Sequence, residues 1–184
     1  MTGWRLRLAA RATRHGGLLA YPTEAVYGLG CDPDDPVAVL DLLALKRRPV
    51  AKGLILIAAD FEQLRPYVLE VAPERMAAVH ASWPGPHTWL LPARPGTPPW
   101  LTGSHTTLAV RVTAHPVAAA LCRAAGPLVS TSATPAGRSP ARDPLTVRRY
   151  FGAALDLVVH GAVDRSRAPS AIRDAATGRV LRSG

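Results

Sequence analysis

Tyr-Pro-Thr-Glu-Ala-Val-Tyr-Gly-Leu-Gly-Cys occupies residues 21–31, and Lys-Arg-Arg-Pro-Val-Ala-Lys-Gly follows at residues 46–53, directly before the apolar run at 54–57. The chain has 22 basic residues, and its only two lysines, Lys46 and Lys52, lie in the second stretch. Lysine presents a compact ammonium where arginine presents a planar fork, so this choice suggests a need for point charges. Two lysines six residues apart across a proline could hold one phosphate chain, and chance placement is the alternative.

The composition predicts one globular domain over residues 1–184. A chain of 184 residues buries roughly 70% of its unfolded surface, which is enough for a full core. Hydrophobic residues make up 48% and charged residues 19%, with 18 prolines and 15 glycines spread through the chain. No repeat, low-complexity tract or linker divides it.

The net charge of +9 favours polyanionic ligands such as nucleotides or RNA. An RNA-binding protein is therefore the alternative to an enzyme. Aromatic residues are only 5%, and no basic run alternates with aromatics as a base-stacking surface requires. If RNA binding were the function, affinity would fall steeply with salt and ATP would have no effect.

Two cysteines without zinc-ligand spacing argue against a disulfide framework and against a metal site. The N-terminal residues lack the continuous apolar core of a signal peptide, and nowhere do 18 apolar residues run together. We therefore expect a cytoplasmic protein with reduced thiols and no membrane partner.

Hydrophobic periodicity and turn residues predict alternating helices and strands. Helices are expected at 4–15, from Pro36 to near Arg48, in two short pieces within 61–81, and at 117–125 and 145–151; strands are expected at 18–21, 54–58, 88–93, 107–113, 127–129, 156–159, 169–174 and 179–184. For the second helix, the expected buried face is Val37, Leu40, Leu43 and Ala44. The pattern indicates an α/β (α+β) domain with a twisted mixed sheet.

The segment after Pro22 is expected to be a loop at a strand end, where α/β sheets bind ligands. Gly28 and Gly30 suggest a need for permissive backbone angles there. Glu24 is the only carboxylate of this segment, so no paired-carboxylate acid/base site is apparent.

Several cations have two interpretations. Lys46 and Arg48 at the end of a helix either bind an anion or are solvated charges that stabilise the helix C-terminus. Lys52 stands directly before a strand, which favours the anion site. Arg111, near a strand end, is either a solvated edge residue or an anion ligand. His115 is expected to cap the helix that follows it.

Hydroxyl side chains cluster at residues 130–134, after a strand, where they suit carboxylate or phosphate oxygens. The sequence contains no GxxxxGK[ST], GxGxxG, GxSxG or HExxH motif. A nucleotide site would therefore be built from dispersed cations and hydroxyls.

The motifs resemble the YrdC family, in its short bacterial form. The resemblance rests on residues 21–32 and 45–57, on Trp-Pro-Gly-Pro at 83–86, on Ala-Val-Arg-Val-Thr-Ala-His-Pro at 109–116 and on Ser-Thr-Ser-Ala at 130–133. It implies a twisted open sheet with flanking helices that enclose a positively lined cavity. It also implies condensation of L-threonine, bicarbonate and ATP to L-threonylcarbamoyl-adenylate and pyrophosphate, with Mg²⁺ carried by ATP. Formation of that product is the first step of the t6A modification of tRNA, so downstream transferase proteins and tRNA are the implied partners.

By position, the resemblance assigns threonine contacts to Thr23, His115 and Ser170. It places the catalytic, phosphate-binding cations at Lys46, Arg48 and Lys52, with further nucleotide contacts from Arg111, Ser132, Thr134, Arg142 and Arg182. Thr134 stands where the family has asparagine. A sugar-phosphate enzyme of the same fold, such as dihydroxybutanone phosphate synthase, would need clustered acidic metal ligands, and the chain offers too few.

Overall fold

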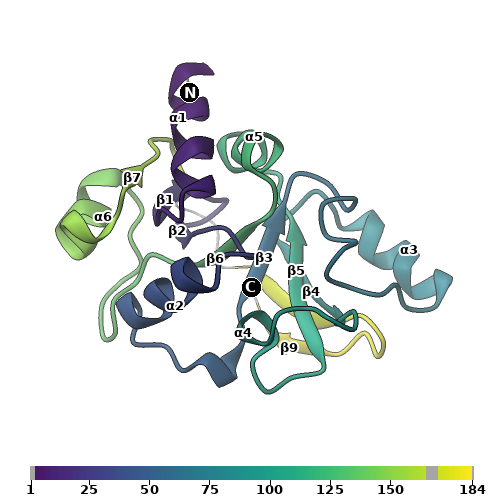
Figure 1. Cartoon of the computed structure of the whole chain (residues 1–184). Coiled ribbons are helices and arrows are strands. Elements are labelled where there is room, and N and C mark those ends of the chain that lie inside the picture. Colours follow the sequence, from purple (N-terminus) through teal and green to yellow (C-terminus); the bar gives the residue numbers. More distant parts are fainter. Residues whose placement is uncertain (1–2, 165–169, 184) are drawn as a thin grey trace.

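A nine-stranded sheet forms the centre of the computed structural model, which describes residues 3–164 and 170–183 (Figure 1). The strand order is β7-β1-β2-β6-β3-β5-β4-β8-β9. The strands are β1 (Leu19–Pro22), β2 (Tyr27–Gly30), β3 (Ile55–Ala58), β4 (His87–Pro92), β5 (Thr107–Val112), β6 (Leu128–Ser132), β7 (Leu157–Val158), β8 (Ala171–Asp174) and β9 (Val180–Arg182). Three neighbouring pairs, β1 with β7, β3 with β5 and β4 with β8, are parallel and the others antiparallel, which confirms the mixed sheet.

Helices cover both faces of this sheet. They are α1 (Gly3–Arg14), α2 (Pro36–Leu45), α3 (Pro73–Ala81), α4 (Pro99–Thr102), α5 (Pro116–Ala125) and α6 (Pro144–Phe151), with 3-10 turns η1 (Val50–Lys52) and η2 (Gly152–Ala154). Figure 1 shows α1 beside α5, which pack against each other. No helix within residues 3–164 and 170–183 is long and apolar enough to cross a membrane.

Alternation along the strands divides the core into two clusters, because successive side chains point to opposite faces. In β3, Leu56 belongs to the larger cluster and Ile57 to the smaller one. The smaller cluster lies against α1 and α5, where Ala9 and Leu121 are fully buried. The larger cluster includes residues of α2, α3 and α6.

The helix α2 begins where the sequence predicts, but it buries a different face. Asp35 caps it by accepting hydrogen bonds from the backbone N–H groups of Val37 and Ala38. Val37 and Leu40, expected in the core, are 67% and 50% exposed, and the buried residues are Ala38, Val39, Leu42 and Leu43. The helix is apolar on most sides, so periodicity could not select the packed face. It ends at Leu45 rather than near Arg48, because Arg47 adopts a left-handed φ of 48°.

The segment after Pro22 is the loop of a tight hairpin, because residues 23–26 form the expected loop at the end of β1 and a further strand follows at once. Residues Tyr27–Gly30 form β2, which pairs with β1 in the register Leu19↔Gly30 and Pro22↔Tyr27. Neither Gly28 nor Gly30 has a positive φ, so the expected reason for these glycines is wrong. A Cβ on Gly30 would lie 2.1 Å from the carbonyl oxygen of Val129. Glycine is therefore needed for close approach between β2 and β6.

Three further differences concern element limits. Residues 62–67 form turns, closed by bonds such as that from the N–H of Leu64 to the carbonyl oxygen of Phe61, so only the second of the two expected helices within 61–81 exists. The strand β6 continues to Ser132 because β2 and β3 pair with it on both sides. The short helix α4 was not expected from the sequence. The two terminal strands are confirmed as β8 and β9, which pair antiparallel, and the parts of the expected strands at residues 169 and 184 lie outside the described residues.

Candidate active site

A cavity of about 670 Å³ opens on one face of the sheet. Paired residues place side chains of neighbouring strands on this face: Ile55 of β3 pairs with Ser130 of β6 and with Ala109 of β5. Arg111 lies two residues beyond Ala109 and therefore faces the same side. All of these residues line the cavity, so the sheet register itself builds the floor.

The described lining carries five cations and one carboxylate. The cations are Arg48, Lys52, Arg111, Arg138 and Arg182, and the carboxylate is Glu24. Hydroxyl groups line the cavity at Thr23, Thr102, Thr107, Ser130, Thr131, Ser132, Thr134 and Ser170. This excess of positive charge in a concave site favours an anionic ligand. The positively lined cavity implied by the resemblance is therefore present.

Arg111 is a buried cation and not a solvated edge residue. Its strand β5 is paired on both sides, and the residue is only 7% exposed. Its Nη2 lies 3.5 Å from Oε2 of Glu24, and its Nε has no hydrogen-bond partner within the described residues. Buried N–H donors are normally hydrogen-bonded, so the unused donors of Arg111 favour binding of an acceptor. The cavity in front of it supplies the room for one.

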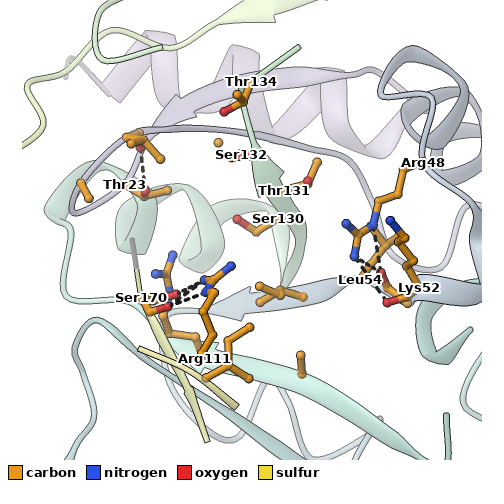
Figure 2. Close-up of a pocket in the computed structure, with 18 of the residues that line it drawn as sticks. Thr23, Arg48, Lys52, Leu54, Arg111, Ser130, Thr131, Ser132, Thr134 and Ser170 are labelled. Atoms are coloured by element: carbon orange, nitrogen blue, oxygen red, sulfur yellow. Dashed lines mark hydrogen bonds between the residues drawn. The ribbon is translucent and has the colours of Figure 1, made fainter. Parts of the chain in front are cut away.

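Arg48 and Lys52 lie on another wall, in the segment between α2 and β3. The guanidinium of Arg48 turns back onto its own loop, where Nη2 donates to the carbonyl oxygen of Gly53 at 2.8 Å and Nε donates to the same oxygen at 3.2 Å. Partial burial lowers the pKa of Arg48. Figure 2 shows Arg48 and Lys52 on one side of the view and Arg111 beside Ser170 on the other, with Ser130 between them.

Lys46 is not among the residues that line the cavity, yet it contacts the strand that does. Its ammonium donates to the carbonyl oxygen of Ser132 at 2.7 Å and also to that of Thr134. Desolvation, followed by the nearby charge of Arg48, lowers the pKa of Lys46 to about 8. Lys46 thus joins the end of α2 to the end of β6.

The hydroxyl cluster predicted at 130–134 lies along the cavity wall (Figure 2). Ser130 and Ser132 belong to β6 itself, and Thr134 follows it. The Oγ1 atom of Thr134 is buried and has no hydrogen-bond partner within the described residues. Thr134 therefore presents a hydroxyl that can both donate and accept a hydrogen bond and that has no partner within the described residues.

Ser170, Arg182 and Arg111 gather at one side of the cavity. Arg182 donates from Nη2 and Nε to the carbonyl oxygen of Ser170, at 2.7 and 3.2 Å. The hydroxyl groups of Ser170 and Thr88 lie 3.1 Å apart. Burial, followed by the charge of Arg111, lowers the pKa of Arg182. Arg111 and Arg182 carry like charges that repel each other, and an anion that lies near both would relieve this repulsion.

Thr23, His115 and Arg142 have different positions. Thr23 lines the cavity and donates its hydroxyl to the carbonyl oxygen of Val26 at 2.7 Å. His115 does not line the cavity: its Nδ1 accepts from the N–H of Ala118, which confirms the predicted cap, and its Nε2 lies 2.8 Å from the carbonyl oxygen of Ala162. Arg142 is not among the lining residues either.

Sequence reasoning did not assign Glu24, Arg138 or His105, which also line the cavity. Glu24 was set aside because no second carboxylate stands near it in sequence. Its partners Arg111 and Thr113 lie 87 or more positions away. Arg138 follows the hydroxyl cluster closely, and that proximity was the available signal. No motif or hydrophobic pattern around His105 marks it as a site residue.

Comparison with known proteins places this architecture in a family. A family model described as Sua5/yciO/yrdC, telomere recombination, matches residues 11–184. A threonylcarbamoyl-AMP synthase from Nitrosococcus oceani is 56% identical over 180 residues, which cover 97% of each chain. One from Pseudomonas aeruginosa PAO1 is 51% identical over 183 residues, which cover 99% of this chain and 98% of the relative.

Solved structures agree. A P. abyssi Sua5 complexed with L-threonine superposes with a TM-score of 0.88 at 34% identity, covering 95% of this chain and 52% of the other, so this chain spans about half of that protein. E. coli YciO superposes with a TM-score of 0.88 at 26% identity, covering 100% and 90% of the two chains. The chain therefore belongs to the Sua5/YciO/YrdC family, as the motifs and the fold both indicate.

Proposed function

We infer that this chain is a threonylcarbamoyl-AMP synthase, a nucleotidyltransferase that uses ATP as a substrate. Relatives at 51–56% identity over nearly the full length carry that name. The observation that carries the inference is the cavity, where cations from four distant segments converge without a phosphate loop. The reaction joins L-threonine, bicarbonate and ATP into L-threonylcarbamoyl-adenylate and releases pyrophosphate and one water, the water being lost when the amine and bicarbonate form the carbamate.

The site suits adenylate formation, in which a carbamate oxygen attacks the α-phosphorus and pyrophosphate leaves. Such a step depends on positioning the reactants and on neutralising charge that builds up on the phosphate oxygens. We propose that Arg48 and Lys52 hold the phosphates from one wall and that Arg111 and Arg182 hold them from the other. Lys46 then acts on the site through the carbonyl groups of Ser132 and Thr134.

Threonine would bind beside Thr23 and Ser170, whose hydroxyl groups can accept or donate hydrogen bonds to its polar groups. The P. abyssi Sua5 structure, which is a complex with L-threonine, supports a threonine site in this fold. His115 has both ring nitrogens engaged by the chain itself. Its contribution would therefore be to hold the start of α5 in place. We also propose that Ser132, Thr134 and Arg142 contact the nucleotide.

Mg²⁺ would arrive with ATP as part of the substrate. No group of three or more His, Cys, Asp or Glu side chains able to hold a metal occurs within the described residues. Glu24, the cavity's carboxylate, already accepts two hydrogen bonds and pairs with Arg111. The phosphate oxygens themselves are the natural ligands of this hard cation.

The product is a reactive mixed anhydride, so water must be kept from it until it is used. We propose that it passes to downstream proteins that transfer the threonylcarbamoyl group to tRNA, in the cytoplasm, as the first step of t6A synthesis. The net charge of +9 would assist an encounter with tRNA.

The function is tested by incubating the protein with ATP, L-threonine and bicarbonate and measuring pyrophosphate release. Omission of each substrate in turn should stop the release, and mass spectrometry should detect threonylcarbamoyl-adenylate. Release of pyrophosphate without threonine would contradict the proposal. RNA binding that falls steeply with salt, in a protein that does not release pyrophosphate, would favour the RNA-binding alternative.

A further inference from the structure

Glu24 is a buried carboxylate that faces a buried arginine at the edge of the cavity. Its side chain is 8% exposed, as is that of Arg111, and Oε2 lies 3.5 Å from Nη2 of Arg111. The other oxygen, Oε1, accepts hydrogen bonds from Oγ1 of Thr113 at 2.9 Å and from the backbone N–H of Ala114 at 3.0 Å. Oε1 therefore binds the backbone and side chain of the segment 113–114, whereas Oε2 faces Arg111.

The bonds at Oε1 determine where Oε2 points. Thr113 Oγ1 is itself held, because it accepts a hydrogen bond from the N–H of His115 at 3.1 Å. This chain of contacts runs from the start of α5 to the carboxylate. A carboxyl group fixed by two donors on one oxygen presents the other in a fixed direction, and a buried negative charge in that place attracts a guanidinium.

Arg111 needs such a fixed partner. An arginine side chain has many rotamers, and ordering it costs conformational free energy. Within the described residues the ion pair with Glu24 is the contact that orients its guanidinium, and the spacing of 3.5 Å leaves its N–H donors unspent. Arg182, the neighbouring cation, repels Arg111 and cannot hold it.

We propose that Glu24 is a positioning residue that directs the guanidinium of Arg111 toward the phosphate groups of ATP. The inference depends on the proposed function, because it takes ATP as the ligand of the cavity. Glu24 itself does not touch the nucleotide, whose phosphates its charge would repel. It acts through Arg111, and Thr113 supports it from the opposite side.

The test is a double-mutant cycle with Glu24→Gln and Arg111→Gln, read as the KM for ATP and the KM for threonine. Glutamine keeps the size of the side chain and an oxygen able to accept from Thr113 and Ala114, but it removes the charge that orients Arg111. We expect Glu24→Gln to raise the KM for ATP about tenfold and to leave the KM for threonine unchanged. On the Arg111→Gln background, Glu24→Gln should have no further effect.

Two outcomes overturn the proposal. Independent effects, in which the double variant shows the product of the two single changes, would mean that Glu24 does not act through Arg111. A rise in the KM for threonine alone would instead assign Oε2 to the substrate's amino group. Pyrophosphate release by the wild-type protein is measured first, so failure of the proposed function is distinguished from failure of this inference.

Control variants separate positioning from folding. Glu62→Gln makes the same chemical change at an exposed carboxylate that pairs with Arg65, and its KM for ATP should equal the wild-type value. Thr113→Val removes one donor to Oε1 and leaves both charges, so it should raise the KM for ATP less than Glu24→Gln does. All variants are compared at a temperature where circular dichroism shows each of them folded.

Discussion

Lys46 donates a hydrogen bond to the carbonyl oxygen of Ser132 at 2.7 Å, across 86 positions of sequence. The contact joins the residue after α2 to the last residue of β6, and the same ammonium also reaches the carbonyl oxygen of Thr134. Ser132 and Thr134, whose carbonyl oxygens accept these bonds, both line the cavity. The charge state of Lys46 therefore affects the shape of the cavity wall.

Activity should fall as the pH rises through about 8, where Lys46 loses its proton. A neutral amine has one hydrogen fewer to donate, and its lone pair is unfavourable beside two carbonyl oxygens. We expect kcat/KM for ATP, which reports groups of the free enzyme, to show an alkaline limb near this pH. In Lys46→Arg, which stays charged, the limb should move to higher pH, and an unchanged limb in that variant would assign the titration to another group.

The free energy of unfolding should rise with pH in the range where activity falls, because it depends on the same proton of Lys46. Between about pH 8 and the ordinary lysine pKa of 10.5, the unfolded chain holds a proton that the folded chain has released. The contribution of Lys46 to the free energy of unfolding therefore rises with pH across this window. Urea titrations of the wild-type protein and of Lys46→Met at several pH values isolate this contribution, and a difference that falls with pH would contradict it.

Lys52→Ala should lose adenylate formation while remaining folded. Its ammonium lines the cavity and makes no hydrogen bond or ion pair within the described residues, so little stability depends on it. Loss of a preorganised charge at a phosphoryl group costs about 100-fold or more in rate. Pyrophosphate release measures this loss. Arg11→Ala removes one positive charge from the exposed face of α1 and should retain wild-type activity.

Thr134→Val should leave stability almost unchanged and weaken nucleotide binding. The buried Oγ1 has no hydrogen-bond partner within the described residues, so its removal breaks no bond there. If this hydroxyl binds the nucleotide, a bond worth about 1 kcal/mol is lost and the KM for ATP rises about fivefold. Thr134→Ser keeps the hydroxyl and should bind ATP normally. Equal KM values for the valine variant and the wild type would remove Thr134 from the site.

Gly30→Ala should destabilise the fold, because the new Cβ would lie 2.1 Å from the carbonyl oxygen of Val129 and 2.9 Å from the Tyr21 ring. Overpacking of this kind costs about 3 kcal/mol, which lowers the melting temperature of a domain of this size by roughly 6–12 °C. Gly137→Ala is the matched control: no heavy atom lies within 4 Å of its Cβ, and only its φ of +70° is unfavourable. A smaller loss for Gly30→Ala than for Gly137→Ala would contradict the close-approach argument.

Local signals in the sequence were sufficient for most helices and strands. The helix start at Pro36, the helix end at residue 125 and the alternation in residues 107–113 depend on signals within a few residues, so they can be interpreted without the rest of the chain. The strand β2 could not be predicted in this way. Its glycines weaken the strand pattern, and their meaning appears only when β6 packs against them.

Residue patterns alone were enough to establish the class of fold, the cations and hydroxyls available to bind a phosphate chain, and the family. Which of these groups meet depends on how the chain packs. Arg111 faces the cavity because β5 pairs with β3 in one register, whereas His115 turns toward the start of α5 and Lys46 toward the end of β6. This division arises because local propensity acts within a few residues, while strand order and register set distances between residues about 90 positions apart.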